Sequence, residues 1–193
     1  MFGPFDFAEG VVVVRATHSG QEGFSVLLFG ESVGEALLID TVGAYAGVRG
    51  NSVSLRNRTG LVPGPQRLLV KADGAWTINV GQQFPEDGID GTAPPLVMAG
   101  RSGDDVERWV RFPEGEFLIR SSHSGTGKFV VGLINSDGGD EVLVVDKTGV
   151  FEGERLLSVG LASSSSSSGA YLAPGVYALV VQANGDWEVN IQP

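Results

Sequence analysis

The 2 histidines of this chain are the residues best suited to chemistry, because they occupy equivalent places. His18 and His123 each end an apolar run and precede Ser-Gly, and Arg15 and Arg120 stand three residues before them. One interpretation is a ligand-binding site, present twice and built from these four side chains. The other is structural, with each ring bonding a nearby backbone group and fixing a turn. The pattern favours the structural role, since a metal site generally needs three or more converging ligands.

A second set of candidates is acidic and clusters near the middle of the chain. Residues 1–83 hold 7 acidic and 6 basic side chains, net −1, whereas residues 84–193 hold 16 and 7, net −9. Calcium prefers carboxylate oxygens, but the acidic run lacks the spacing of an EF-hand loop, so a solvated linker is the competing interpretation. Calcium is the only cofactor we consider, and its candidate ligands are Asp87, Asp90, Asp104, Asp105 and Glu107.

The tryptophans suit either a sugar-stacking surface or a hydrophobic core. Trp76 and Trp187 each follow an Asp/Asn-Gly turn, where a carbohydrate-binding module would present flat aromatic rings. Each also begins a strictly alternating run that places the indole on the apolar face, which favours burial. Trp109 has no tryptophan counterpart, since Pro4 stands at the matching position, so it is a candidate for a ligand contact or an interdomain contact.

Support for catalysis in the sequence is sparse. The absence of cysteine excludes disulfides, thiol catalysis and Cys-ligated zinc, and no pairing of a nucleophile with a base is evident. Asp40 and Asp146 form a tempting carboxylate pair for glycoside hydrolysis, but we expect each to cap a turn in its own half. We therefore predict that the chain is not an enzyme and name no catalytic residue.

The recurrence of these residues reflects an internal duplication. Phe7-Ala8-Glu9-Gly10 returns as Phe112-Pro113-Glu114-Gly115 at an offset of 105, which becomes 106 and then 111 after the serine tract Ser163–Ser168. An insertion that leaves the flanking pattern intact belongs in a surface loop. We predict two homologous units at residues 1–83 and 96–193, joined by an acidic, Gly/Pro-rich linker at 84–95. Leu96–Gly100 is expected to be a leading strand of the second unit, and its counterpart in the first is either supplied from elsewhere or absent.

Each unit is expected to consist of short strands. The 29 glycines and 9 prolines punctuate apolar runs, and no segment shows a capped helical period. The spacers after His18 and His123 begin with Ser-Gly, which suits a hairpin between the runs on either side. Six or seven strands in about 80 residues call for two packed sheets. We predict an all-β chain of two tandem antiparallel β-sandwiches, jelly-roll-like or immunoglobulin-like, with the strand order left open. The expected strands are Val11–Arg15, Phe24–Phe29, Ala36–Ile39, Ser52–Leu55, Arg67–Lys71 and Trp76–Val80 in the first unit, and Phe117–Arg120, Phe129–Ile134, Val142–Val145, Tyr177–Val181 and Trp187–Ile191 in the second.

These turn and core motifs carry a resemblance to a known kind of module. An accessory β-sandwich of secreted bacterial and archaeal proteins is resembled by the series Ser102-Gly103-Asp104-Asp105, Phe112-Pro113-Glu114-Gly115, His123-Ser124-Gly125, Pro174-Gly175-Val176-Tyr177 and Gly185-Asp186-Trp187-Glu188-Val189-Asn190-Ile191. The series is also distantly similar to the bacterial pre-peptidase C-terminal domain. The resemblance implies a non-catalytic role outside the cell or on its surface. Met1-Phe2-Gly3-Pro4 has no features of a signal peptide, so either the leader is missing from this chain or the protein stays inside the cell.

The sequence therefore predicts a structural or interaction module of a secreted or surface protein, with a protein or glycan partner. A carbohydrate-binding module is the alternative, and an enzyme acting on polysaccharide or peptide ranks last. With a net charge of −10, nucleic acid is not an expected partner. Membrane insertion is not expected either, because no apolar run approaches the roughly 20 residues of a spanning helix.

Overall fold

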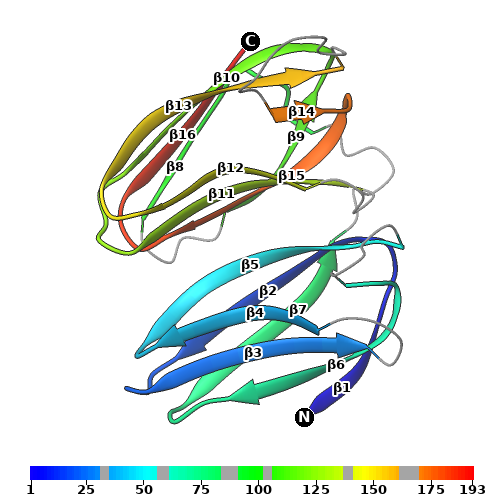
Figure 1. Cartoon of the computed structure of the whole chain (residues 1–193), viewed down its shortest axis with the longest axis vertical. Coiled ribbons are helices and arrows are strands. Elements are labelled where there is room, and N and C mark those ends of the chain that lie inside the picture. Colours follow the sequence, from blue (N-terminus) through cyan, green and yellow to red (C-terminus); the bar gives the residue numbers. More distant parts are fainter. Residues whose placement is uncertain (31–34, 56–60, 84–90, 102–105, 137–140, 161–169) are drawn as a thin grey trace. The chain divides into compact units, whose positions relative to one another are not determined.

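The computed structural model describes residues 1–30, 35–55, 61–83, 91–101, 106–136, 141–160 and 170–193. These ranges contain sixteen strands and no helix, which confirms the all-β prediction. The strands fall into two compact units, unit 1 with β1–β7 and unit 2 with β8–β16 (Figure 1). The serine tract Ser163–Ser168 and residues 84–90 of the predicted linker lie outside the described residues.

Unit 1 contains two sheets. One has the order β1-β6-β3-β4 and the other the order β5-β2-β7, all with antiparallel pairs. An immunoglobulin domain keeps its first two strands in one sheet, whereas β1 and β2 lie in different sheets here. The strands are β1 (Phe2–Phe7), β2 (Gly10–His18), β3 (Gly23–Gly30), β4 (Glu35–Val42), β5 (Tyr45–Val53), β6 (Gly64–Lys71) and β7 (Trp76–Gln83).

Unit 2 repeats this plan and adds strands at two edges. Its sheets have the orders β9-β15-β11-β12 and β14-β13-β10-β16-β8. With β8 and β14 set aside, the remaining seven strands follow the order of unit 1 strand for strand, as a duplication requires. The strands are β8 (Leu96–Gly100), β9 (Val106–Phe112), β10 (Gly115–His123), β11 (Lys128–Asn135), β12 (Glu141–Thr148), β13 (Phe151–Val159), β14 (Ala170–Leu172), β15 (Gly175–Ala183) and β16 (Trp187–Gln192).

The register of the strands confirms the alignment of the two halves. His18 pairs with Trp76 between β2 and β7, and His123 pairs with Trp187 between β10 and β16. The short strand β14 also has a trace in unit 1, because the parallel bridge of Val53 with Leu61 matches the end of the β13–β14 pairing. The predicted superposition of the histidines and tryptophans is therefore confirmed at the level of backbone pairing.

The predicted hairpin after each histidine is wrong. β2 and β3 lie in different sheets of unit 1, and so do β10 and β11 in unit 2. The Ser-Gly spacer instead carries the chain across the end of the sandwich. The histidine ring before the spacer and the phenylalanine ring after it point into the core from opposite sheets. The short connection contains glycine and would suit a hairpin, but here it forms an arch between the two sheets.

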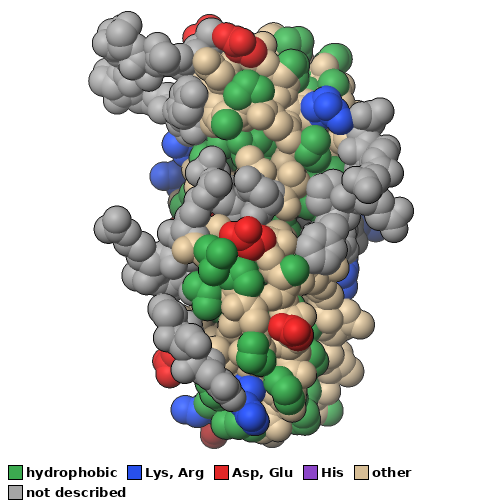
Figure 2. Space-filling view, turned by 90° about the vertical axis from the view of Figure 1, so that its right-hand side faces the viewer, with side chains coloured by type: hydrophobic (Ala, Val, Ile, Leu, Met, Phe, Trp, Pro, Cys, Tyr) green, Lys and Arg blue, Asp and Glu red, His purple; other side chains and the backbone are tan. Residues whose placement is uncertain are grey.

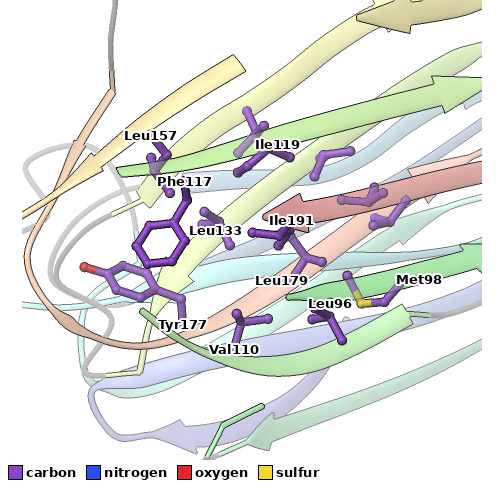
Figure 3. Packing of buried hydrophobic residues seen from close by; sticks show 14 of the residues in the cluster. Leu96, Met98, Val110, Phe117, Ile119, Leu133, Leu157, Tyr177, Leu179 and Ile191 are labelled. Atoms are coloured by element: carbon purple, nitrogen blue, oxygen red, sulfur yellow. The ribbon is translucent and has the colours of Figure 1, made fainter. Parts of the chain in front are cut away.

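One hydrophobic core lies in each unit, formed by side chains from both of its sheets. In unit 2 the core includes aromatic and aliphatic residues of both sheets, among them Phe117, Leu157 and Tyr177 (Figure 3). Figure 3 also shows Leu96 and Met98 of β8 in this cluster. Unit 1 has an equivalent core around Phe24 and Leu28, against which Trp76, Ile78 and Val80 of β7 are only partly buried.

The described end of the predicted linker lies on unit 2. Thr92 forms a parallel bridge to Val110 of β9, donating its N–H to the Trp109 carbonyl at 3.0 Å and accepting from Arg111 N at 3.2 Å. Four residues later β8 begins, and it pairs with β16 in the opposite sheet. This leader, residues 91–100, therefore covers an edge strand of each sheet of unit 2.

Candidate functional site

Each histidine ends the central strand of its sheet and points into the sandwich. His18 and His123 are only 3% and 2% exposed. Their rings stack on the first aromatic residue of the next strand, His18 on Phe24 with centroids 4.6 Å apart and His123 on Phe129 at 4.9 Å. We call this arrangement the histidine corner. The packing holds each ring in one place and leaves little of it accessible to a ligand.

One ring nitrogen of each histidine is bonded to the backbone. His18 Nδ1 lies 3.0 Å from the Gly43 carbonyl oxygen, and His123 Nδ1 lies 2.9 Å from that of Gly149. A carbonyl oxygen can only accept, so Nδ1 must carry the proton. Both glycines have positive φ, 85° and 89°, a conformation that glycine adopts at little cost. The histidine thus fixes the turn between two strands that belong to opposite sheets.

The two corners differ at the other ring nitrogen. In unit 1 the carboxylate of Asp73 approaches His18 Nε2 to 3.0 Å without forming a hydrogen bond to it. Asp73 also accepts from the backbone N–H groups of Glu22 and Gln21, each at 2.9 Å. The N–H of Glu22 is the main reason that the pKa of Asp73 lies below its usual range, and the N–H of Gln21 and the charge of His18 also lower it.

In unit 2 a neutral side chain takes this position. Asn184 replaces the aspartate and accepts from Gly127 N at 2.8 Å, so the loop after the histidine is still held. His123 Nε2 has no hydrogen-bond partner among the described residues. A carboxylate is therefore not essential to the histidine corner, because the amide oxygen also accepts a backbone hydrogen bond from the loop and carries no charge.

The Ser-Gly pair that follows each histidine also has a structural role. Ser19 donates its backbone N–H to the Ala75 carbonyl at 2.9 Å, and Ser124 does the same to the Asp186 carbonyl. A Cβ on Gly20 would collide with the Asp73 carboxylate and the His18 ring. The motif is thus accounted for by one strand connection packing closely on another.

The other residues of the predicted ligand site are not brought to the histidines. Arg120 lies on the outer face of β10, where it pairs with Glu154 at 3.4 Å and contacts Gln192. Arg15 occupies the equivalent place on β2, and an odd separation along a strand puts arginine and histidine on opposite faces. Trp109 is on the outer face of β9, since its neighbour Val110 is in the core. The predicted cluster is therefore distributed over separate surfaces.

A second duplicated arrangement was not predicted from the sequence. Arg49 Nε donates to the Leu38 carbonyl at 3.1 Å, and Arg155 Nη1 donates to the Val144 carbonyl at 3.2 Å. Each carbonyl belongs to the extra residue of a β-bulge, where the register of β3–β4 or β11–β12 shifts. The arginine bonds a backbone group that the bulge removes from regular pairing, and it links one sheet to the other. Burial lowers the pKa of Arg49, and nearby Tyr45 partly opposes the shift. The offset of 106 between Arg49 and Arg155 was the available sequence signal.

The predicted acidic metal site cannot be located. Asp87, Asp90, Asp104 and Asp105 lie outside the described residues, and of Glu107 only the backbone, in β9, is described. Within the described ranges, no three His, Asp or Glu side chains gather as a possible metal site.

The predicted turn-capping role of Asp40 and Asp146 is wrong. Both residues lie inside strands, β4 and β12 respectively, rather than at turns. They are exposed, and Asp146 forms an ion pair with Lys128 at 2.6 Å. Surface pairs of this kind contribute little to stability.

Trp76 and Trp187 do not form an exposed aromatic surface. Trp187 is buried at 3% exposure, and Trp76 is half-buried with Phe2 edge-on to its ring at 5.5 Å. Figure 2 shows basic and acidic side chains scattered singly over the visible face rather than gathered in one patch. The described segments include no helix with the length and apolarity to cross a membrane. Comparisons with known protein-family models and with curated proteins find no match for the chain.

Proposed function

We propose that this chain is a non-catalytic pair of β-sandwiches that serves as a structural or interaction module of a secreted or surface protein. The observation that carries the proposal is the environment of the two histidine side chains. Each is almost fully buried, stacked on a phenylalanine and bonded through Nδ1 to a glycine carbonyl. A catalytic or ligand-binding imidazole needs an accessible nitrogen. In these rings Nδ1 is bonded to the backbone and Nε2 is buried.

The duplicated arginines support the same proposal. Arg49 and Arg155 are directed to backbone carbonyls of the neighbouring sheet, so their donors also maintain the sandwich. The same polar side chains recur in two units because the fold needs them twice. A secreted or surface setting rests on the resemblance to accessory β-sandwiches.

The carbohydrate-binding alternative has weaker support. A sugar platform requires exposed, coplanar rings. Trp187 is in the core, and Trp76 packs against the core of its own unit. Neither is presented as a flat surface.

The proposal is tested by replacing each histidine with phenylalanine in the full chain. His18→Phe and His123→Phe keep a stacked ring but lose the bond to the glycine, so we expect a stability loss of about 0.5–1.5 kcal/mol in the affected unit. The exposed Lys147→Ala is the matched control, with an expected change within about 0.5 kcal/mol. All four proteins are assayed for thermal unfolding, glycan binding and hydrolysis of polysaccharides and peptides.

The expected result is no hydrolysis and no glycan binding by any of the four proteins, with lower melting temperatures for the two histidine variants. The proposal is overturned if the parent protein hydrolyses or binds a glycan and a folded histidine variant loses that activity.

A further inference from the structure

We infer that the outer edge of β7 in unit 1 is an acceptor site for an added β-strand. The occupant is an extended segment of a partner polypeptide with the pattern apolar-x-apolar-x-Gly, running antiparallel to β7. This inference rests on the proposed function, since it names the surface and the partner of an interaction module.

Unit 2 provides the template for this added strand. There, β8 pairs antiparallel with β16, placing Gly100 opposite Trp187, Met98 opposite Val189 and Leu96 opposite Ile191. Figure 3 shows Leu96 and Met98 beside Ile191, Leu179 and Val110, so the added strand supplies two side chains to the core. With β8 in place, Trp187, Val189 and Ile191 are 3%, 0% and 0% exposed.

The equivalent position in unit 1 has no such strand. Among the described residues β7 pairs only with β2, and its inward residues Trp76, Ile78 and Val80 remain partly buried. Phe2 covers one side of the Trp76 ring and is itself 47% exposed, so the cover is incomplete. The two units therefore differ in burial at the place where β8 is present in one and lacking in the other.

The composition of β7 also suits an acceptor. Edge strands of soluble proteins are commonly protected by charged residues, proline or a bulge. The other edge strands of unit 1 have such features, namely Pro4 in β1, Glu35 in β4 and Arg49 in β5. β7 reads Trp-Thr-Ile-Asn-Val-Gly-Gln-Gln, with no charge and no proline, and pairs with β2 without a register shift. Nothing in its sequence discourages pairing with another strand.

The glycine of the pattern follows from the contact seen in unit 2. A Cβ on Gly100 would lie 2.7 Å from the Trp187 ring, so the indole occupies the space of a side chain on the opposite residue. A strand laid against Trp76 in the same way needs glycine at that position. The two apolar residues of the pattern would then face Ile78 and Val80, as Met98 and Leu96 face their partners.

The same requirement excludes a second copy of β7 as the occupant. Opposite residues of an antiparallel pair point to the same face. Gly81 is five residues from Trp76, so it belongs to the outer face while Trp76 belongs to the inner face. Pairing Gly81 with Trp76 would place Ile78 opposite Asn79, and the in-register alternative places Val80 opposite Trp76. A partner segment with glycine on its apolar face is therefore favoured over self-association.

The experiment uses the full chain and a synthetic peptide spanning residues 93–101, whose central part is Leu-Val-Met-Ala-Gly. Backbone NMR follows which amides shift on titration. We expect saturable one-to-one binding, with shifts along β7 and a change in Trp76 fluorescence. A peptide with Gly100→Val is the matched control, and steric conflict with the indole should weaken binding roughly tenfold or more. A second peptide, with Met98→Asp, should fail to bind because it would bury a charge.

Three results would overturn the inference. These are no binding up to the solubility limit of the peptide, equal binding of the Gly100→Val peptide, or shifts located on β16 instead of β7. The proposed function is judged separately by the histidine variants, so a failed titration leaves that test unaffected. Because the control changes are made in the peptides, the folding of the protein is the same in every arm.

Discussion

Unit 1 and unit 2 have the same seven-strand plan, the same histidine corner and the same hydrogen bond from an arginine, Arg49 or Arg155, to the carbonyl of a bulge. They differ along one side. In unit 2 the leader covers both sheets there, with Thr92 on β9 and β8 on β16. In unit 1 the corresponding strands β1 and β7 have no such cover within the described residues. The duplicated polar residues therefore serve the folding of each unit, whereas the edges are where the two units have diverged.

The largest expected effect tests this difference in the core. Trp187→Ala removes an indole that is closed in by β8, and should destabilise unit 2 by about 3–5 kcal/mol. Trp76→Ala removes a half-buried indole and should cost unit 1 clearly less. Denaturant unfolding of the two variants measures both values, and equal losses would contradict the account of an open edge.

An intermediate effect is expected from a feature that both units share. Arg49→Ala and Arg155→Ala each leave the carbonyl of a bulge without its donor, which should cost about 1–3 kcal/mol. The two losses should be similar, because the geometry is repeated. Arg49→Lys and Arg155→Lys serve as controls that keep the charge but not the planar donor group. If neither alanine variant lost stability in the unfolding curves, the hydrogen bond from arginine to the bulge carbonyl would not stabilise the fold.

The smallest expected effect concerns acid. The pKa of Asp73 is held below its usual value of 3.8, chiefly by the N–H of Glu22. Its contribution to stability is thus present above the pKa of the unfolded state and is lost as the pH falls through the lower folded-state pKa. The amide NMR signals of Gln21 and Glu22 should shift in that range.

Exchanging the two corner residues provides the control for this titration. Asp73→Asn gives unit 1 the side chain of unit 2 and should abolish the acid-dependent shifts without unfolding the unit. Asn184→Asp should create a titration at the Gly127 amide. Acid shifts that persist in Asp73→Asn would assign them to another group.

Much of the fold could be predicted because the sequence repeats itself. The alternation Trp-x-Ile-x-Val and its counterpart located the last strand of each unit, and Leu96–Gly100 was predicted at its observed bounds. Missed altogether were β1, β9, β13 and β14, together with most of β5. Gly-Pro in β1 and Gly47, Gly50 and Asn51 in β5 weaken the apolar period. The arch after each histidine was mistaken for a hairpin, because the residues of a turn do not determine which sheet the next strand joins.

The candidate site could be predicted only in part. The equivalence of His18 and His123 was visible, and so was their structural alternative, but their partners Gly43 and Gly149 lie 25 and 26 residues away. Such partners follow from the packing of two sheets rather than from spacing along the chain. Arg15 and Arg120 were grouped with the histidines by proximity in sequence, although the strand period places them on the opposite face.

Hydrogen exchange of the last strand of each unit measures the difference between their edges. In β16 both edges are paired, with β10 and with β8, whereas β7 is paired only with β2 in the described structure. We predict that the β7 amides pointing away from β2 exchange rapidly, while all amides from Trp187 to Ile191 exchange slowly. Equal and slow exchange along both strands would show that β7 is already covered, and would contradict the claim that the two units differ at this edge.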